Sequence, residues 1–176
     1  ITLLITQINS TESLGQYSLI FSVLNTLAIF SLAGLGRYVN LTIPNLHFSY
    51  HKSFLFKAIK IIIFFVIATT VALLLAKRLN LINEKYVFFI DSNVIYFILP
   101  FTIISFISQT FLSYRNQTFF SFNNVLINLS ILIILLIQIY LLKIIKIIPL
   151  IYSGIALSFI LSCLLFFNLL KNKKVF

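Results

Sequence analysis

Charged residues are scarce in this chain of 176 residues, and acidic ones are almost missing. Asp, Glu, Lys and Arg together make up 9% of the sequence, against about 25% in soluble domains. Apolar residues make up 61%, and the mean hydropathy is +1.12. Because so few charges cannot cover a globular surface, the composition predicts an integral membrane protein.

Methionine is absent, and cysteine occurs once, at Cys163. A single cysteine excludes an intrachain disulfide and a cysteine-based metal site. The opening segment, residues 1–8, is apolar but too short to span a bilayer. It also lacks the basic start and long apolar core of a signal peptide. We therefore expect a fragment that opens within a truncated first helix.

Long apolar runs are what the sequence has in abundance, and a helix needs about 20 such residues to cross the hydrocarbon layer. Five runs meet this requirement, at residues 17–35, 54–76, 92–114, 117–142 and 147–170. They are too long and too continuously apolar for barrel strands, which alternate over about 10 residues. With the truncated helix at 1–8, they predict an all-α bundle of about six transmembrane helices in a single transmembrane domain, 1–176.

Lysine and arginine are divided unevenly between the two sets of connections. One set holds Arg37, Lys52, Lys57, Lys60, Arg115, Lys171, Lys173 and Lys174. The other set holds the remaining five, together with all three acidic residues. Since basic residues favour the cytoplasmic side, the first set is expected to face the cytoplasm. The net charge of +10 then reflects topology, and no nucleic-acid partner is expected.

Polar side chains recur at helical spacing in two of the expected helices. The helix at 92–114 carries Thr102, Ser105, Gln109 and Ser113, and the helix at 117–142 carries Gln117, Ser121, Asn124 and Asn128. Each set shares one helix face. We interpret the two stripes as the lining of a cavity open to the cytoplasm. The alternative is interhelical hydrogen bonding that only holds the bundle together.

Two glycines and an arginine, Gly34, Gly36 and Arg37, lie at the end of the apolar run 17–35. A dinucleotide-binding loop would need a third glycine and a preceding strand, and position 39 is Val. Gly34 and Gly36 are instead expected to allow close helix packing or a local bend. Arg37 and Arg115 are candidates either for lipid headgroups or for the phosphates of an anionic substrate, because guanidinium binds phosphate with two hydrogen bonds.

Other residues with reactive or metal-binding side chains form no promising group. His47 and His51 lie four residues apart, but a third ligand is missing, so no metal site is expected. The complete spans contain no Asp or Glu, which argues against a cationic substrate. We expect no cofactor and no catalytic residue.

The segment "SLGQYSLIFSVLNTLAIFSLAGLGRYV", residues 13–39, resembles the first periplasmic turn and second helix of polysaccharide flippases. That family shows a short turn of the form LG-x-x-x-G-x-Y, an apolar helix, then GL and a basic residue. These proteins are the Wzx-type O-antigen and capsule transporters of the multidrug/oligosaccharidyl-lipid/polysaccharide exporter superfamily. Family members commonly place the arginine about seven residues after the glycine of GL. Here that position is Leu41, and Arg37 lies one helical turn before it.

The resemblance implies a transporter of two six-helix lobes, of which this chain would be most of the N-terminal one. It implies transport of an undecaprenyl-pyrophosphate-linked oligosaccharide across the cytoplasmic membrane of a bacterium by alternating access. The expected substrate-binding candidates are Arg37, Gln109, Arg115, Gln117, Asn124 and Asn128. Membrane lipids and the polysaccharide polymerase machinery are the further expected partners.

Two other functions are compatible with a membrane bundle. A cation-coupled multidrug exporter of the same superfamily would need a carboxylate within the membrane, and the complete spans have none. A membrane polymerase or ligase of oligosaccharides usually carries a large external loop, and the connections here are short. The sequence therefore favours a transporter without enzymatic activity.

Overall fold

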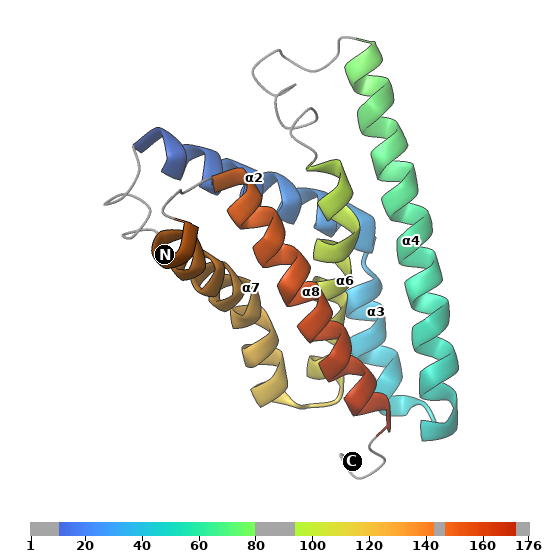
Figure 1. The fold of residues 1–176 in the computed structure, drawn as a ribbon. Helices are drawn as coiled ribbons and strands as arrows, with labels where there is room; N and C mark the ends of the chain where they lie inside the picture. The colour runs from blue at the N-terminus through green and yellow to red at the C-terminus, as the bar shows by residue number, and fades with distance from the viewer. Residues whose placement is uncertain (1–10, 80–93, 143–146, 172–176) are drawn as a thin grey trace.

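The structure is a computed structural model that describes residues 11–79, 94–142 and 147–171, which form a helical bundle (Figure 1). The six α-helices are α2 (Thr11–Leu32), α3 (Leu35–Thr42), α4 (Phe48–Arg78), α6 (Ile95–Ser113), α7 (Gln117–Ile137) and α8 (Ile147–Lys171). A short 3-10 helix, Ile43–Asn45, follows α3, and a π-helical turn, Gln138–Leu142, follows α7. No strand occurs in these ranges, so the predicted all-α fold is confirmed.

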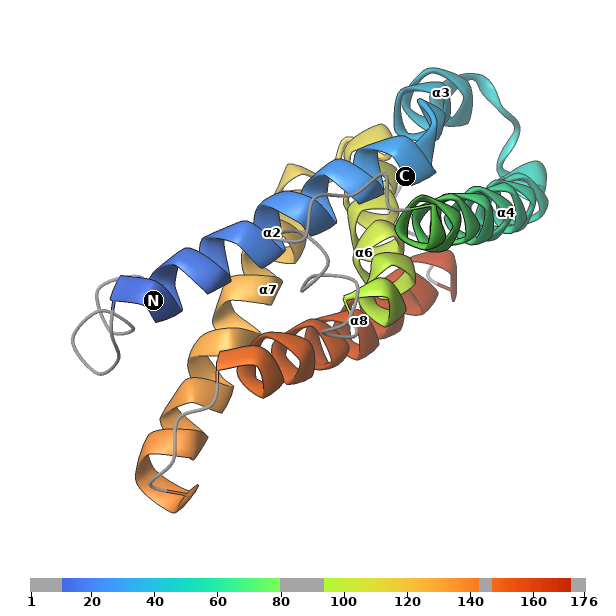
Figure 2. The same cartoon turned by 90° about the horizontal axis from the view of Figure 1, so that it is seen from above.

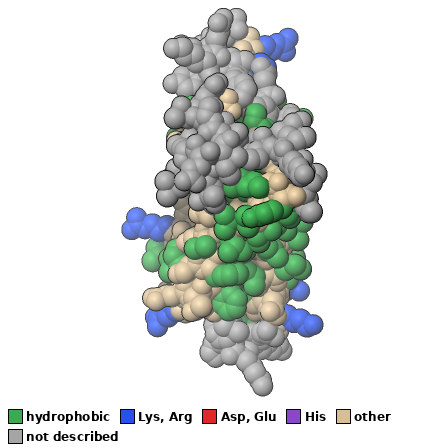
Figure 3. Space-filling view, turned by 60° about the vertical axis from the view of Figure 1, so that its left-hand side comes forward, with side chains coloured by type: hydrophobic (Ala, Val, Ile, Leu, Met, Phe, Trp, Pro, Cys, Tyr) green, Lys and Arg blue, Asp and Glu red, His purple; other side chains and the backbone are tan. Residues whose placement is uncertain are grey.

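Five of the helices, all except α3, are long and apolar enough to cross a membrane. They correspond to the five predicted spans, whereas the truncated helix predicted at 1–8 lies outside the described residues. Figure 3 shows hydrophobic side chains over the middle of one face, with Lys and Arg at its margins. A broad apolar surface of this kind suits contact with the hydrocarbon of a bilayer.

The predicted helix at 17–35 differs from the structure at both ends, because α2 begins at Thr11 and ends at Leu32. Ala33 and Gly34 then adopt left-handed backbone with φ of 45° and 78°. Glycine reaches this region without steric cost. The chain turns here and continues as α3, so the bend predicted at these glycines is confirmed at Gly34.

Helix α4 begins at Phe48, six residues before the predicted start at 54. Its first turns carry His51 and Lys52, which the predicted limits leave in the connection before the span. A helix of 31 residues is about 46 Å long, whereas the hydrocarbon layer is about 30 Å thick. The polar first turns of α4 therefore extend beyond the hydrocarbon.

The remaining limits lie close to the prediction. Helix α6 ends at Ser113 and α8 at Lys171, each within one residue of the expected end, while residues 92 and 93 are outside the described residues. The run 117–142 is helical throughout but changes to π-helical pitch at Gln138. In Figure 1 the α3–α4 connection, the α6–α7 turn and the end of α8 lie at the same, lower end. The spans thus alternate as predicted, and the assignment of this end to the cytoplasm stays a prediction.

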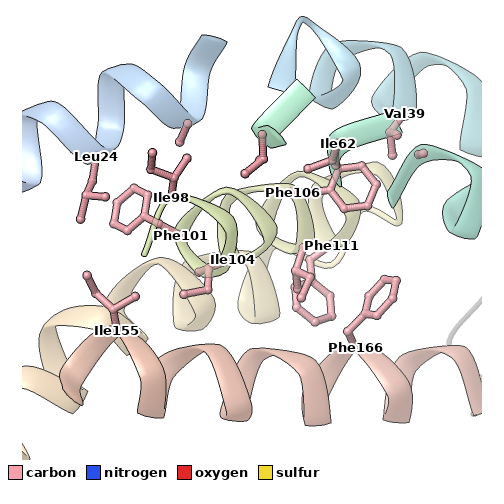
Figure 4. Packing of buried hydrophobic residues seen from close by; sticks show 14 of the residues in the cluster. Leu24, Val39, Ile62, Ile98, Phe101, Ile104, Phe106, Phe111, Ile155 and Phe166 are labelled. Atoms are coloured by element: carbon pink, nitrogen blue, oxygen red, sulfur yellow. The ribbon is translucent and has the colours of Figure 1, made fainter. Parts of the chain in front are cut away.

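Helix α6 is the centre of the bundle and contacts α2, α3, α4, α7 and α8. Figure 4 shows its side chains Ile98, Phe101 and Phe106 among residues from neighbouring helices. Seen from above, α2, α4, α7 and α8 surround α6 (Figure 2). Since lipid tails are as apolar as these side chains, close packing rather than exclusion of water holds such a bundle together.

A polar cleft between two helices

The predicted stripe on α6 turns largely into the bundle. Thr102 is fully buried and its hydroxyl donates to the carbonyl of Ile98 at 2.6 Å. Ser105 and Ser113 likewise donate to carbonyls of their own helix, at 3.1 and 2.6 Å. Hydroxyls bonded in this way are satisfied without a ligand.

Gln109, the fourth member of the α6 stripe, connects α6 to α3. Its Oε1 accepts a hydrogen bond from Asn40 Nδ2 at 2.9 Å. Next to this bond, a Cβ on Gly36 would lie 3.0 Å from Cγ of Gln109. The close packing predicted for the glycines is therefore confirmed at Gly36, and Gln109 is occupied in holding α3 against α6.

Asn123, which the stripe analysis does not select, is the polar centre where α6, α7 and α8 meet. It is fully buried, and its Nδ2 donates to Ser108 Oγ at 2.7 Å and to the Ile104 carbonyl at 3.2 Å. Its Oδ1 accepts from Ser162 Oγ at 2.7 Å. The sequence shows a polar residue in each of these three apolar spans. Which of them bond to one another becomes visible only in the folded structure.

The predicted stripe on α7 lies on the surface of the bundle instead. Gln117, Ser121, Asn124 and Asn128 are all exposed. Asn124 and Asn128 line a cavity of about 220 Å³ between α2 and α7. Its other polar lining includes Asn25 from α2 and Ser105 from α6. We call this cavity the polar cleft; α6 forms its floor.

Helix α2 carries a polar stripe of its own that the sequence prediction does not include. Ser18, Ser22 and Asn25 are exposed and follow the spacing i, i+4, i+7, which places them on one face. This spacing is the one that identified the α7 stripe, so periodicity could have found it. Of these three residues, Asn25 lines the polar cleft.

Toward the upper ends of α2 and α7 the cleft gives way to apolar packing. Tyr17 and Phe21 of α2 pack against the buried cluster of Ile131, Leu135 and Leu150. The rings of Tyr17 and Phe21 are 4.9 Å apart, and that of Phe21 is 6.1 Å from the ring of Phe101. Phe21 and Phe101 thus line the cleft beside its polar groups.

The two candidate arginines lie outside the lining of the polar cleft. Arg37 is exposed on α3. Its neighbour Tyr38 contacts Phe54 of α4, with ring centroids 5.6 Å apart, and Arg37 is about 100° around the helix from Tyr38. Arg115 is exposed in the α6–α7 turn and has a φ of 55°.

Of the six predicted site residues, the structure brings Asn124 and Asn128 together in the polar cleft. Gln109 bonds to Asn40 instead. Gln117, Arg37 and Arg115 are exposed and do not line this cavity. Asn25 of α2 is the addition that the fold makes to the set.

The two histidines have separate structural roles. His47 caps α4, where its Nδ1 accepts from the Ser49 backbone N–H at 3.5 Å. His51 is buried and its Nε2 donates to the Leu46 carbonyl at 2.9 Å, while its Nδ1 is 3.1 Å from the Tyr114 hydroxyl. Burial raises the pKa of Tyr114 to about 12, so this phenol stays neutral. Over the described ranges no three potential metal ligands of the His, Cys, Asp and Glu types come together.

The fold and the placement of its charges define a multi-pass α-helical membrane protein. Its described part combines five candidate spans with a polar cleft in their midst. No protein-family model, curated protein or solved structure matches the chain.

Proposed function

We propose that this protein transports a lipid-linked oligosaccharide across the membrane and that the polar cleft receives its sugar groups. The observation that carries the proposal is the exposed amide set, Asn25, Asn124 and Asn128, around a cavity within the spans. An amide left facing hydrocarbon would lose hydrogen bonds at considerable cost. A water-filled passage or a polar cargo removes that cost.

The chemistry of the lining suits a neutral, hydroxyl-rich cargo. Each amide offers both donors and an acceptor, as sugar hydroxyls do in return. The spans bring no carboxylate to the cleft, because Asp and Glu are missing from residues 13–83 and 92–176. The lining therefore favours sugar over a cationic drug.

The phosphates of such a cargo would be met at the lower end. Arg115 is exposed in the α6–α7 turn and Arg37 on the first turn of α3, and a guanidinium group stays charged and binds phosphate through paired hydrogen bonds. In this arrangement the sugar enters between α2 and α7 while the phosphates remain at the headgroup level. The second lobe of the transporter, the coupling ion and the bacterial cytoplasmic membrane belong to the same proposal.

The test compares two double variants of the full-length protein. Asn25→Leu with Asn124→Leu removes the amides of the cleft from α2 and α7. Thr26→Val with Ser121→Ala is the matched control, since both residues are exposed neighbours outside the cleft lining. Two lost hydrogen bonds of about 1 kcal/mol each predict a roughly thirtyfold slower transport.

Transport is measured in vesicles that contain a fluorescent undecaprenyl-pyrophosphate saccharide, by the rate at which a membrane-impermeant quencher gains access to it. We expect slow transport in the cleft variant and normal transport in the control. Equal rates in both variants, at equal protein content, would reject the cleft as the sugar site. A cleft variant that alters only the export of cationic drugs would replace the proposed function by multidrug export.

A further inference from the structure

A second cavity lies at the lower end, between the start of α4 and the end of α8. Its volume is about 360 Å³. The polar part of the lining comes from the start of α4, namely the cap residue His47 and, in the first turns, Ser49 and Lys52. Phe48 of α4 and Leu169 and Leu170 of α8 form the apolar part. One cavity therefore offers a cation and hydroxyl next to hydrocarbon side chains.

The inner wall of this cavity is fixed by hydrogen bonds. His51 and Tyr114 line it, and the 3.1 Å contact between them joins α4 to the end of α6. The bond from His51 to the Leu46 carbonyl, 2.9 Å long, holds the ring at its other nitrogen. These two bonds fix the positions of His51 and Tyr114, which form the buried inner wall of the cavity.

The charge around the cavity is positive without an opposing carboxylate. Lys52 is exposed at its edge, and Lys171 lies in the last turn of α8, one residue beyond Leu170. No Asp or Glu occurs in residues 13–83 or 92–176, which include every element of the cavity. The phenol of Tyr114 adds no negative charge, because burial keeps it protonated.

We propose that this cavity binds the phosphate headgroup of an anionic phospholipid, with Lys52 at the phosphate and Phe48, Leu169 and Leu170 beside the start of an acyl chain. Basic pockets between membrane helices bind such headgroups. The position fits, because α4 is about 46 Å long and its first turns reach the headgroup level.

This site is separate from the proposed transport site. The polar cleft is lined by α2, α6 and α7, whereas the second cavity is lined by residues of α4 and α8, the His47 cap and Tyr114. No residue lines both. The proposal therefore does not rest on the transport of an oligosaccharide, and either can fail alone.

Lys57 provides a matched control for Lys52. Both are exposed lysines in the first turns of α4, but only Lys52 lines the cavity. Purified protein in a neutral detergent is titrated with phosphatidylglycerol, and bound lipid is counted by native mass spectrometry. Because one basic residue near a lipid headgroup strengthens binding about fivefold, its loss in Lys52→Gln should weaken binding by about that factor. Lys57→Gln should bind as the unchanged protein does, and Lys52→Arg should retain binding.

Several results would overturn this proposal. Equal losses in the Lys52→Gln and Lys57→Gln variants would mean diffuse attraction to a basic surface, and no loss in either would mean that the cavity is empty of lipid. Phosphatidylcholine bound as tightly as phosphatidylglycerol would remove the role of charge. Displacement of phosphatidylglycerol by a pyrophosphate-linked saccharide at the same site would assign the cavity to the cargo.

Discussion

Substitution of Asn123 by alanine should destabilise the bundle more than any change to its exposed neighbour Asn124. Asn123 is fully buried and takes part in three hydrogen bonds that join α7 to α6 and α8. In membrane proteins such bonds average about 0.6 kcal/mol and reach about 1.7 kcal/mol. Three of them predict a loss of about 2 kcal/mol in the free energy of unfolding.

The contribution of the best-placed bond can be isolated by a double-mutant cycle. Ser162 Oγ donates to Asn123 Oδ1 at 2.7 Å, so Asn123→Ala and Ser162→Ala remove the same interaction from opposite sides. The two single losses should exceed the loss in the double variant by about 1 kcal/mol. Asn124→Ala, at the next position on α7 but exposed, should change the stability by less than about 0.5 kcal/mol.

The measurement is reversible unfolding in mixed micelles of increasing denaturing detergent, followed by helical circular dichroism. Equal stability of the Asn123→Ala and Asn124→Ala variants would refute the assignment of Asn123 to the helix contact. Additive losses in the Asn123 and Ser162 cycle would refute the bond between them. In either case the register of α7 against α8 would differ from the one described.

Two further predictions concern the α7–α8 contact and the lower end. A Cβ on Gly154 would lie 3.2 Å from Cα of Ile131 and closer still to its side chain, so Gly154→Ala should cost about 1–3 kcal/mol of stability through overpacking. The same unfolding assay checks this, and an unchanged midpoint would contradict it, with Ala156→Gly on the exposed face of α8 as the control for helix propensity. Burial raises the pKa of Tyr114 from 10 to about 12, so its contribution to stability is fully present below pH 10 and falls as the pH rises toward 12. The slope is at most about 1.4 kcal/mol per pH unit. The stability of the protein relative to its Tyr114→Phe variant should therefore decline between pH 9 and pH 11, and a constant difference would contradict this.

The spans could be predicted from the sequence because a run of about 20 apolar residues has few alternatives to a membrane helix. Their ends could not, since a helix continues through polar residues once it leaves the hydrocarbon. His51 and Lys52 in the first turns of α4 are examples. The end of α2 is set by backbone conformation at Ala33 and Gly34. Hydropathy contains no information about that conformation.

The polar residues were harder to place than the spans. Helical periodicity groups Asn124 with Asn128 correctly, but it does not state whether their face points to α6 or to the surface. Asn123 and Asn124 are adjacent and chemically identical, and both border the polar cleft, yet Asn123 is fully buried and Asn124 is exposed. Only the position of α8, which brings Ser162 to Asn123, separates their roles.

The left-handed pair Ala33–Gly34 divides one wall of the bundle into two helices that run in different directions (Figure 1). The lower helix, α3, is held to α6 by the bond from Asn40 to Gln109 and by the close approach of Gly36. The upper helix, α2, carries Asn25 and the aromatic pair Tyr17 and Phe21. The bend thus lets one stretch of chain pack α3 closely against α6 and still bring Asn25 of α2 to the polar cleft.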